Sequence, residues 1–149
     1  MKFFILLSVL ISLNAFSSEN YKLNCSFEEK QKVYKIDAVL KVEDGWFSDS
    51  AQLVSFKSQM NDRDQSCDLL GSEGTFVEEY SDRLKIDIMS SDCYAQTKIF
   101  LPGLSLAKLI QQGSYQSNKV KVEVTIISRG SYDDDYYMYD YVAKCTLRK

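Results

Sequence analysis

The sequence predicts a mainly β domain: a small antiparallel β-barrel or sandwich of about eight strands, with one short helix and two disulfides. Three observations predict this fold class. Polar and apolar residues alternate along several segments, one helical pattern occupies about residues 105–112, and four cysteines follow an export signal. The chain has a single proline and no low-complexity linker, which favours one domain.

Residues 1–17 are typical of a secretory signal peptide. Lys2 precedes a mostly apolar run over residues 3–13, and Ala15 and Ser17 have the spacing that a signal peptidase reads. The run is shorter than the ~20 apolar residues that cross a bilayer, so a retained membrane anchor is the less favoured alternative. We therefore expect residues 18–149 to form a single exported domain without a membrane span, in a bacterial periplasm or outside the cell.

Strict alternation, which indicates half-buried strands, is clearest over residues 34–42, 83–88 and 119–126. Asp44-Gly45 predicts a two-residue hairpin turn, with Trp46-Phe47 and residues 53–57 in the returning strand. Further strands are expected over residues 21–27, 75–79, 95–101 and 136–147. The helix over 105–112 has Ser105 as its cap, Leu104 and Leu109 at staple positions, and Gly113 as its stop.

The first and last strands have matching polarity, with Cys25 and Cys145 on the apolar side of each. Pairing these strands would close the sheet and remove two exposed edges, which favours a barrel. The plan is similar to that of small calycin-type barrels, but the helix here precedes the last two strands and no calycin motif is visible. No family is assigned on this basis.

Four cysteines allow three pairings, and we predict Cys25–Cys145 together with Cys67–Cys93. Antiparallel terminal strands would bring Cys25 and Cys145 within disulfide reach. The cysteines at 67 and 93 both lie in polar, turn-rich stretches. A Cys25–Cys67 and Cys93–Cys145 arrangement remains the alternative.

The chain contains no histidine, which excludes Ser-His-Asp and Cys-His catalysis and every histidine-ligated metal site. Ser105 and Lys108 match the S-x-x-K pattern, but its partner motifs are absent and a capped helix explains both residues. Residues 62–73 resemble a calcium loop, with Cys67 where the loop requires glycine. We predict no catalytic residue, no metal and no cofactor.

Three adjacent aspartates near the C-terminus form the candidate ligand site. The candidate residues are Tyr132, Asp133, Asp134, Asp135 and Tyr136. Clustered carboxylates and aromatic faces could bind a ligand, although a solvated hairpin tip explains the same pattern. The following tyrosines at 137, 139 and 141 share the parity of Cys145 and are expected to line the interior.

These patterns favour an exported, disulfide-braced β-domain that is non-enzymatic and has a binding, inhibitory or structural role. The partner would be a protein or a carbohydrate. The formal net charge of −3 argues against nucleic acid, which needs a basic face. The alternative is a small carboxylate-based hydrolase acting on polysaccharide or peptidoglycan, and a third hypothesis is a barrel around an apolar ligand.

Overall fold

The computed structural model describes residues 17–60, 63–67, 75–88, 95–129 and 134–149, which form nine strands and one helix. The elements are β1 (Ser18–Glu29), β2 (Lys32–Glu43), β3 (Ser50–Met60), β4 (Arg63–Cys67), β5 (Thr75–Glu79), β6 (Arg83–Ile88), β7 (Ala95–Pro102), α1 (Leu106–Gln112), β8 (Ser114–Arg129) and β9 (Asp134–Arg148).

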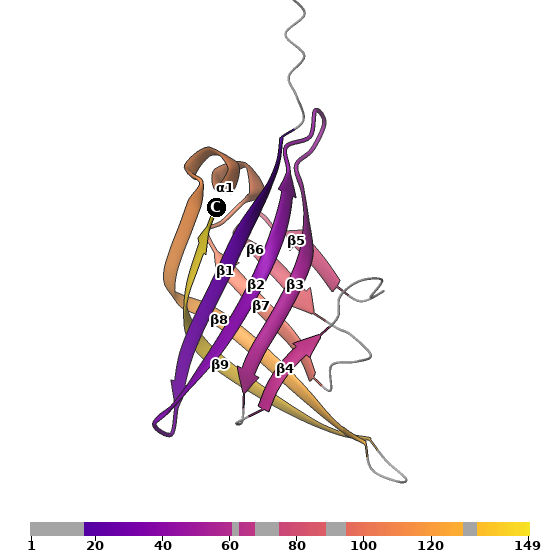
Figure 1. Cartoon of the computed structure of the whole chain (residues 1–149), viewed down its shortest axis with the longest axis vertical. Coiled ribbons are helices and arrows are strands. Elements are labelled where there is room, and N and C mark those ends of the chain that lie inside the picture. Colours follow the sequence, from indigo (N-terminus) through magenta and orange to yellow (C-terminus); the bar gives the residue numbers. More distant parts are fainter. Residues whose placement is uncertain (1–16, 61–62, 68–74, 89–94, 130–133) are drawn as a thin grey trace, which may run out of the picture.

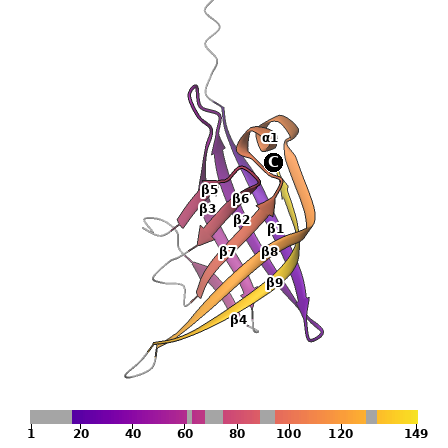
Figure 2. The ribbon, with the colours of Figure 1, turned by 180° about the vertical axis from the view of Figure 1, so that it is seen from behind.

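All nine strands belong to one antiparallel sheet with the order β4-β3-β2-β1-β9-β8-β7-β6-β5. Strands that are neighbours in sequence pair with each other, except β4 and β5, which form the two edges of the sheet, and the pairing of β1 with β9 joins the two ends of the chain. The sheet curls into a nearly closed barrel, whose two faces are seen in Figures 1 and 2. β3 and β5 approach each other across the remaining seam. The predicted mainly β barrel is confirmed, and the sandwich alternative is wrong because a single sheet forms the wall.

The interior of the barrel is filled by the apolar residues of the alternating strands. β1 shows the pattern plainly: Tyr21, Leu23, Cys25 and Phe27 are buried, and the residues between them face outward or are half-buried. The even residues of the segment 119–126 that the structure describes, Val120, Val122 and Val124, are also buried, as the sequence predicts. The hydrophobic effect thus fixes which face of each strand turns inward.

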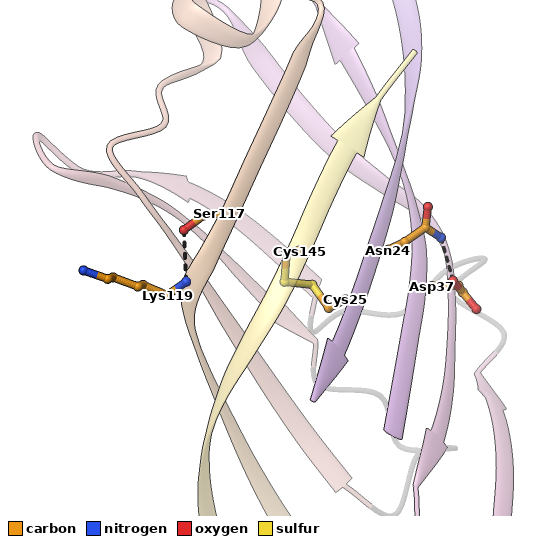
Figure 3. Close-up of a disulfide and its surroundings, with 6 residues drawn as sticks. All are labelled: Asn24, Cys25, Asp37, Ser117, Lys119 and Cys145. Carbon is orange, nitrogen blue, oxygen red and sulfur yellow. Dashed lines mark hydrogen bonds between the residues drawn. A yellow bond between two sulfur atoms is a disulfide. The ribbon is translucent and has the colours of Figure 1, made fainter. Parts of the chain in front are cut away.

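Two β-bulges change the parity of burial within a strand. In β3, Leu53 pairs with Leu40 and Ser55 pairs with Val39, so Val54 is the extra residue. In β8, the register shifts between Ser117 and Val120. There the Ser117 hydroxyl accepts a hydrogen bond of 3.2 Å from the backbone N–H of Lys119 (Figure 3).

Helix α1 lies at one end of the barrel (Figure 1). Its Ser105 cap accepts a 3.2 Å hydrogen bond from the Lys108 N–H, and Gly113 ends the helix with a left-handed φ of 70°. Leu106 and Leu109 are buried against the core. The predicted helix, its cap and its stop are confirmed, with the helix beginning one residue later than expected.

The predicted Cys25–Cys145 disulfide is present and links β1 to β9 (Figure 3). The two residues are direct partners in the β1–β9 ladder, which confirms the expected contact between the terminal strands. Cys93 lies outside the described residues, as does the side chain of Cys67, so the Cys67–Cys93 pairing stays a prediction.

The predicted two-residue turn at Asp44-Gly45 is wrong, as is the placement of Trp46-Phe47 in the returning strand. Glu43 pairs with Ser50, so the connection after β2 spans six residues, 44–49, and Trp46 and Phe47 belong to this loop and not to a strand. Gly45 serves the loop by its lack of a side chain, because a Cβ there would lie 2.1 Å from the Ser48 carbonyl oxygen. The tight two-residue turn is instead at Lys30-Gln31, where both φ angles are positive, at 49° and 66°.

A short strand was also missed. Residues 63–67 form β4 and pair with β3 at one edge of the sheet, in a segment that the sequence indicates to be a polar loop. An extended strand across five positions of the proposed calcium loop is incompatible with the tight turn that such a loop requires. The calcium interpretation of residues 62–73 therefore fails at residues 63–67, and the rest of it lies outside the described residues.

Candidate functional site

The β8–β9 hairpin extends beyond the rest of the barrel, at the end opposite to α1 (Figures 1 and 2). The β1–β9 ladder covers only the register from Lys22–Arg148 to Ser26–Lys144, whereas β9 begins at Asp134. In its first part β9 therefore pairs with β8 but, among the described residues, not with β1. The edge of this part of β9 that faces away from β8 therefore has no ladder partner among the described strands.

Aromatic side chains line the place where β1 and β9 separate. We define the aromatic row as Phe27, Tyr34, Tyr137, Tyr139 and Tyr141. The ring of Phe27 stacks on Tyr34 at 5.4 Å between centroids and on Tyr141 at 4.4 Å, and Tyr141 stacks on Tyr139 at 6.3 Å. Stacked rings of this kind fix one another in orientation and hold these four rings in line, and Tyr137 follows two residues from Tyr139 on the same face of β9.

The row passes from the core to the solvent. Phe27 and Tyr34 are buried and Tyr141 is half-buried, whereas Tyr139 is 41% exposed and Tyr137 is 49% exposed. The prediction that the tyrosines at 137, 139 and 141 share the inward face is right in parity. It is wrong in burial for Tyr137 and Tyr139, which lie where β9 no longer pairs with β1.

The Tyr141 hydroxyl is held in its neutral form. Burial is the main cause, and the nearby Glu29 carboxylate, which hydrogen-bonds the hydroxyl, adds to it; together they raise the pKa of Tyr141 to about 12. Glu29 is the last residue of β1 and brings a carboxylate to the row from the strand opposite. The row thus combines flat apolar ring faces with hydroxyl groups and one acid.

The candidate residues at the hairpin tip are only partly described. Tyr132 and Asp133 lie outside the described residues. Asp134, Asp135 and Tyr136 open β9 and pair along the backbone with Arg129, Ser128 and Ile127, but their side chains lie outside the described part of the chain. The proposed ligand site there stays a prediction, and the aromatic row continues directly from it along β9.

The sequence did not point to Phe27, Tyr34 or Glu29 as parts of a site. Phe27 and Tyr34 are cross-strand partners, three residues outside the turn at Lys30-Gln31. That turn contains neither glycine nor asparagine, so nothing in the sequence marked it. With the turn known, the pairing of these two aromatic residues would follow from the register.

A second candidate is an open groove of about 490 Å³ on the outer face of β6, β7 and β8. Its lining residues are Asp82, Arg83, Phe100, Pro102, Lys119, Lys121 and Glu123. Most of its charges already have partners: Lys121 pairs with Glu123 at 2.6 Å and with Asp140 at 3.3 Å. The Arg83 guanidinium lies over the rings of Tyr80 and Phe100. This groove is explained by contacts within the protein and is the weaker candidate.

Other arrangements that could support catalysis or metal binding have structural explanations. The Ser105 hydroxyl caps α1, and the Lys108 ammonium donates to the Gly103 carbonyl at 3.0 Å, so the two do not form a nucleophile–base pair. Among the described residues, the carboxylates with clearly shifted pKa values are Glu19 and Glu78, and lysine partners lower both. Within the described residues, no group of three or more potential metal ligands is present.

No family model, curated protein or solved structure matches the chain. The described part of the chain contains no helix with the length and apolar character needed to cross a bilayer.

Proposed function

We propose that the protein is a non-enzymatic, exported binding protein whose aromatic row holds a carbohydrate chain. The observation that carries the proposal is the exposure of Tyr137 and Tyr139 on the inward-facing side of β9, in the part of β9 that does not pair with β1. An apolar ring exposed on the side that normally faces a core is costly unless a ligand covers it.

The chemistry of the row favours a sugar over a purely apolar ligand. A tyrosine ring offers a flat apolar face together with a hydroxyl that donates and accepts hydrogen bonds. A pyranose ring has the same combination, with C–H groups on its faces and hydroxyl groups around its edge. The neutral Tyr141 and the Glu29 carboxylate extend the polar side of the row toward the barrel.

The alternative of a carboxylate-based hydrolase has less support. Such an enzyme needs two convergent acids, one of which is held protonated by a raised pKa. The clearly shifted carboxylates of the described residues have lowered values and lysine partners. Glu29 stands beside tyrosines and has no second carboxylate in the row. A binding role needs only the aromatic rings, the hydroxyl groups and the single carboxylate that the row contains.

Sedimentation with insoluble peptidoglycan sacculi tests the proposal on the chain from residue 18 to 149. We expect Tyr139→Ala to weaken binding about fivefold to tenfold, which corresponds to one lost stacking contact of about 1–1.4 kcal/mol. Met138→Ala is the matched control, because Met138 lies on the opposite face of the same strand and is 72% exposed. Equal binding by wild type and Tyr139→Ala, or release of soluble sugar by the wild type, would contradict the proposal.

A further inference from the structure

The loop between β2 and β3 presents two aromatic side chains to solvent at the end of the barrel opposite to the aromatic row. Trp46 is 76% exposed and Phe47 is 97% exposed. The loop stands at the top of the molecule in Figure 1, beyond α1. Two adjacent aromatic residues with so little cover are a surface that gains free energy when something apolar covers it.

Backbone contacts hold the conformation of this loop. The Ser48 carbonyl approaches Gly45 so closely that no other residue fits there without a shift. At the base of the loop, Glu43 pairs with Ser18 of β1 on one side and with Ser50 of β3 on the other. Trp46 and Phe47 therefore extend from a base that is tied to the start of β1.

In the uncleaved chain, residue 17 lies at the base of the loop, so the segment that precedes it indicates what the loop lies close to. The apolar run of residues 3–13 ends only four residues before Ser17, and four residues span at most about 14 Å. While that run is in a membrane, either during export or as a retained anchor, this end of the barrel is the end nearest to the lipid. Tryptophan is enriched at the boundary between bilayer and water, where its apolar ring contacts lipid and its N–H group contacts water.

The charges around the loop restrict the kind of lipid surface. Asp44 and Asp49 flank the two aromatic residues, and the neighbouring Glu43 is paired with Lys41 at 2.7 Å. Carboxylates at this position are repelled by anionic headgroups, which attract basic segments instead. We propose that Trp46 and Phe47 form an interfacial contact with a zwitterionic lipid surface, which leaves the aromatic row pointing away from the bilayer.

Tryptophan fluorescence tests this directly, because Trp46 is the only tryptophan of the chain. The probe is vesicles of phosphatidylcholine, added to the protein from residue 18 to 149. We expect the Trp46 emission to move to shorter wavelength and the protein to sediment with the vesicles. Phe47→Ser keeps the reporter and should lower the partition coefficient roughly tenfold, since part of the value of a buried phenylalanine is lost.

Met138→Ser, at the opposite end of the barrel, is the matched control and should bind as the wild type does. Thermal melting confirms that each variant is folded. An Asp44→Asn/Asp49→Asn variant should gain binding to phosphatidylglycerol vesicles. Unchanged Trp46 emission with phosphatidylcholine would overturn the proposal, as would equal losses for Phe47→Ser and Met138→Ser, or tighter wild-type binding to the anionic vesicles.

Discussion

Cys25 and Cys145 face each other directly across the β1–β9 ladder, with their Cα atoms 4.1 Å apart and a sequence separation of 120. Both side chains lie in the core. The bond therefore holds the two ends of the chain together at the ladder that joins the first strand to the last. It also lies just before the point where β1 and β9 separate and the aromatic row begins.

Removal of this disulfide should cost much of the stability of the domain. The crosslink lowers the conformational entropy of the unfolded chain, and for a loop of this length that stabilises the folded state by about 4–5 kcal/mol. We expect the free energy of unfolding of a Cys25→Ala/Cys145→Ala variant to fall by an amount of that order in denaturant titrations.

Non-reducing peptide mapping of the wild type should give a Cys25–Cys145 peptide and a Cys67–Cys93 peptide. A Cys25–Cys67 peptide would contradict the closure of the barrel by β1 and β9.

Lys85 should matter more for stability than other charged residues of the outer face. Its ammonium contacts Glu78 at 2.8 Å and Asp87 at 3.1 Å, and both Lys85 and Asp87 are mostly buried. Lys85→Met leaves the Asp87 carboxylate with the Gln96 amide, so we expect a loss of about 1–3 kcal/mol in the free energy of unfolding. Lys121→Met is the control. It breaks a more exposed pair and should cost less, and the reverse order would refute this account.

Alkaline pH should weaken the fold through Tyr141. Its folded-state pKa of about 12 lies above the ordinary 10.0, so the folded protein retains the proton longer than the unfolded chain does. The contribution is complete below pH 10.0 and is lost as the pH rises through about 12. Denaturant titrations over this window should show a falling free energy of unfolding. The fall should be less steep in Tyr141→Phe, and identical slopes would show that Tyr141 is not the titrating group.

The predictions from the sequence were right where one local rule determined the structure. The alternation fixed the inward faces of most strands, Ser105 and Gly113 fixed the ends of the helix, and the apolar parity of Cys25 and Cys145 led to the right pair. The predictions were wrong where contacts between distant parts of the chain determined the local structure. The turn at Lys30-Gln31 has no typical turn residue, and the bulge at Val54 changes parity without a signal.

The candidate site was predictable only in part, for a related reason. Parity placed Tyr137 and Tyr139 on the inward side of β9, but their exposure depends on where β1 stops pairing with β9. The β1–β9 ladder ends at Ser26–Lys144, and a strand pattern does not say how far along two strands the pairing continues. The exposed half of the row follows from this geometry and not from the residues themselves.

In the proposed function, the exposed tyrosines of the aromatic row contact a sugar. Nuclear magnetic resonance spectra of protein with isotope-labelled tyrosine rings, titrated with soluble glycan fragments of peptidoglycan, test this claim residue by residue. The ring signals of Tyr137 and Tyr139 should shift with the added glycan. Those of Tyr21 and Tyr115, which lie toward the end of the barrel that carries α1, should not. Absence of any shift, or shifts confined to Tyr21 and Tyr115, would contradict the assignment of the aromatic row as the binding site.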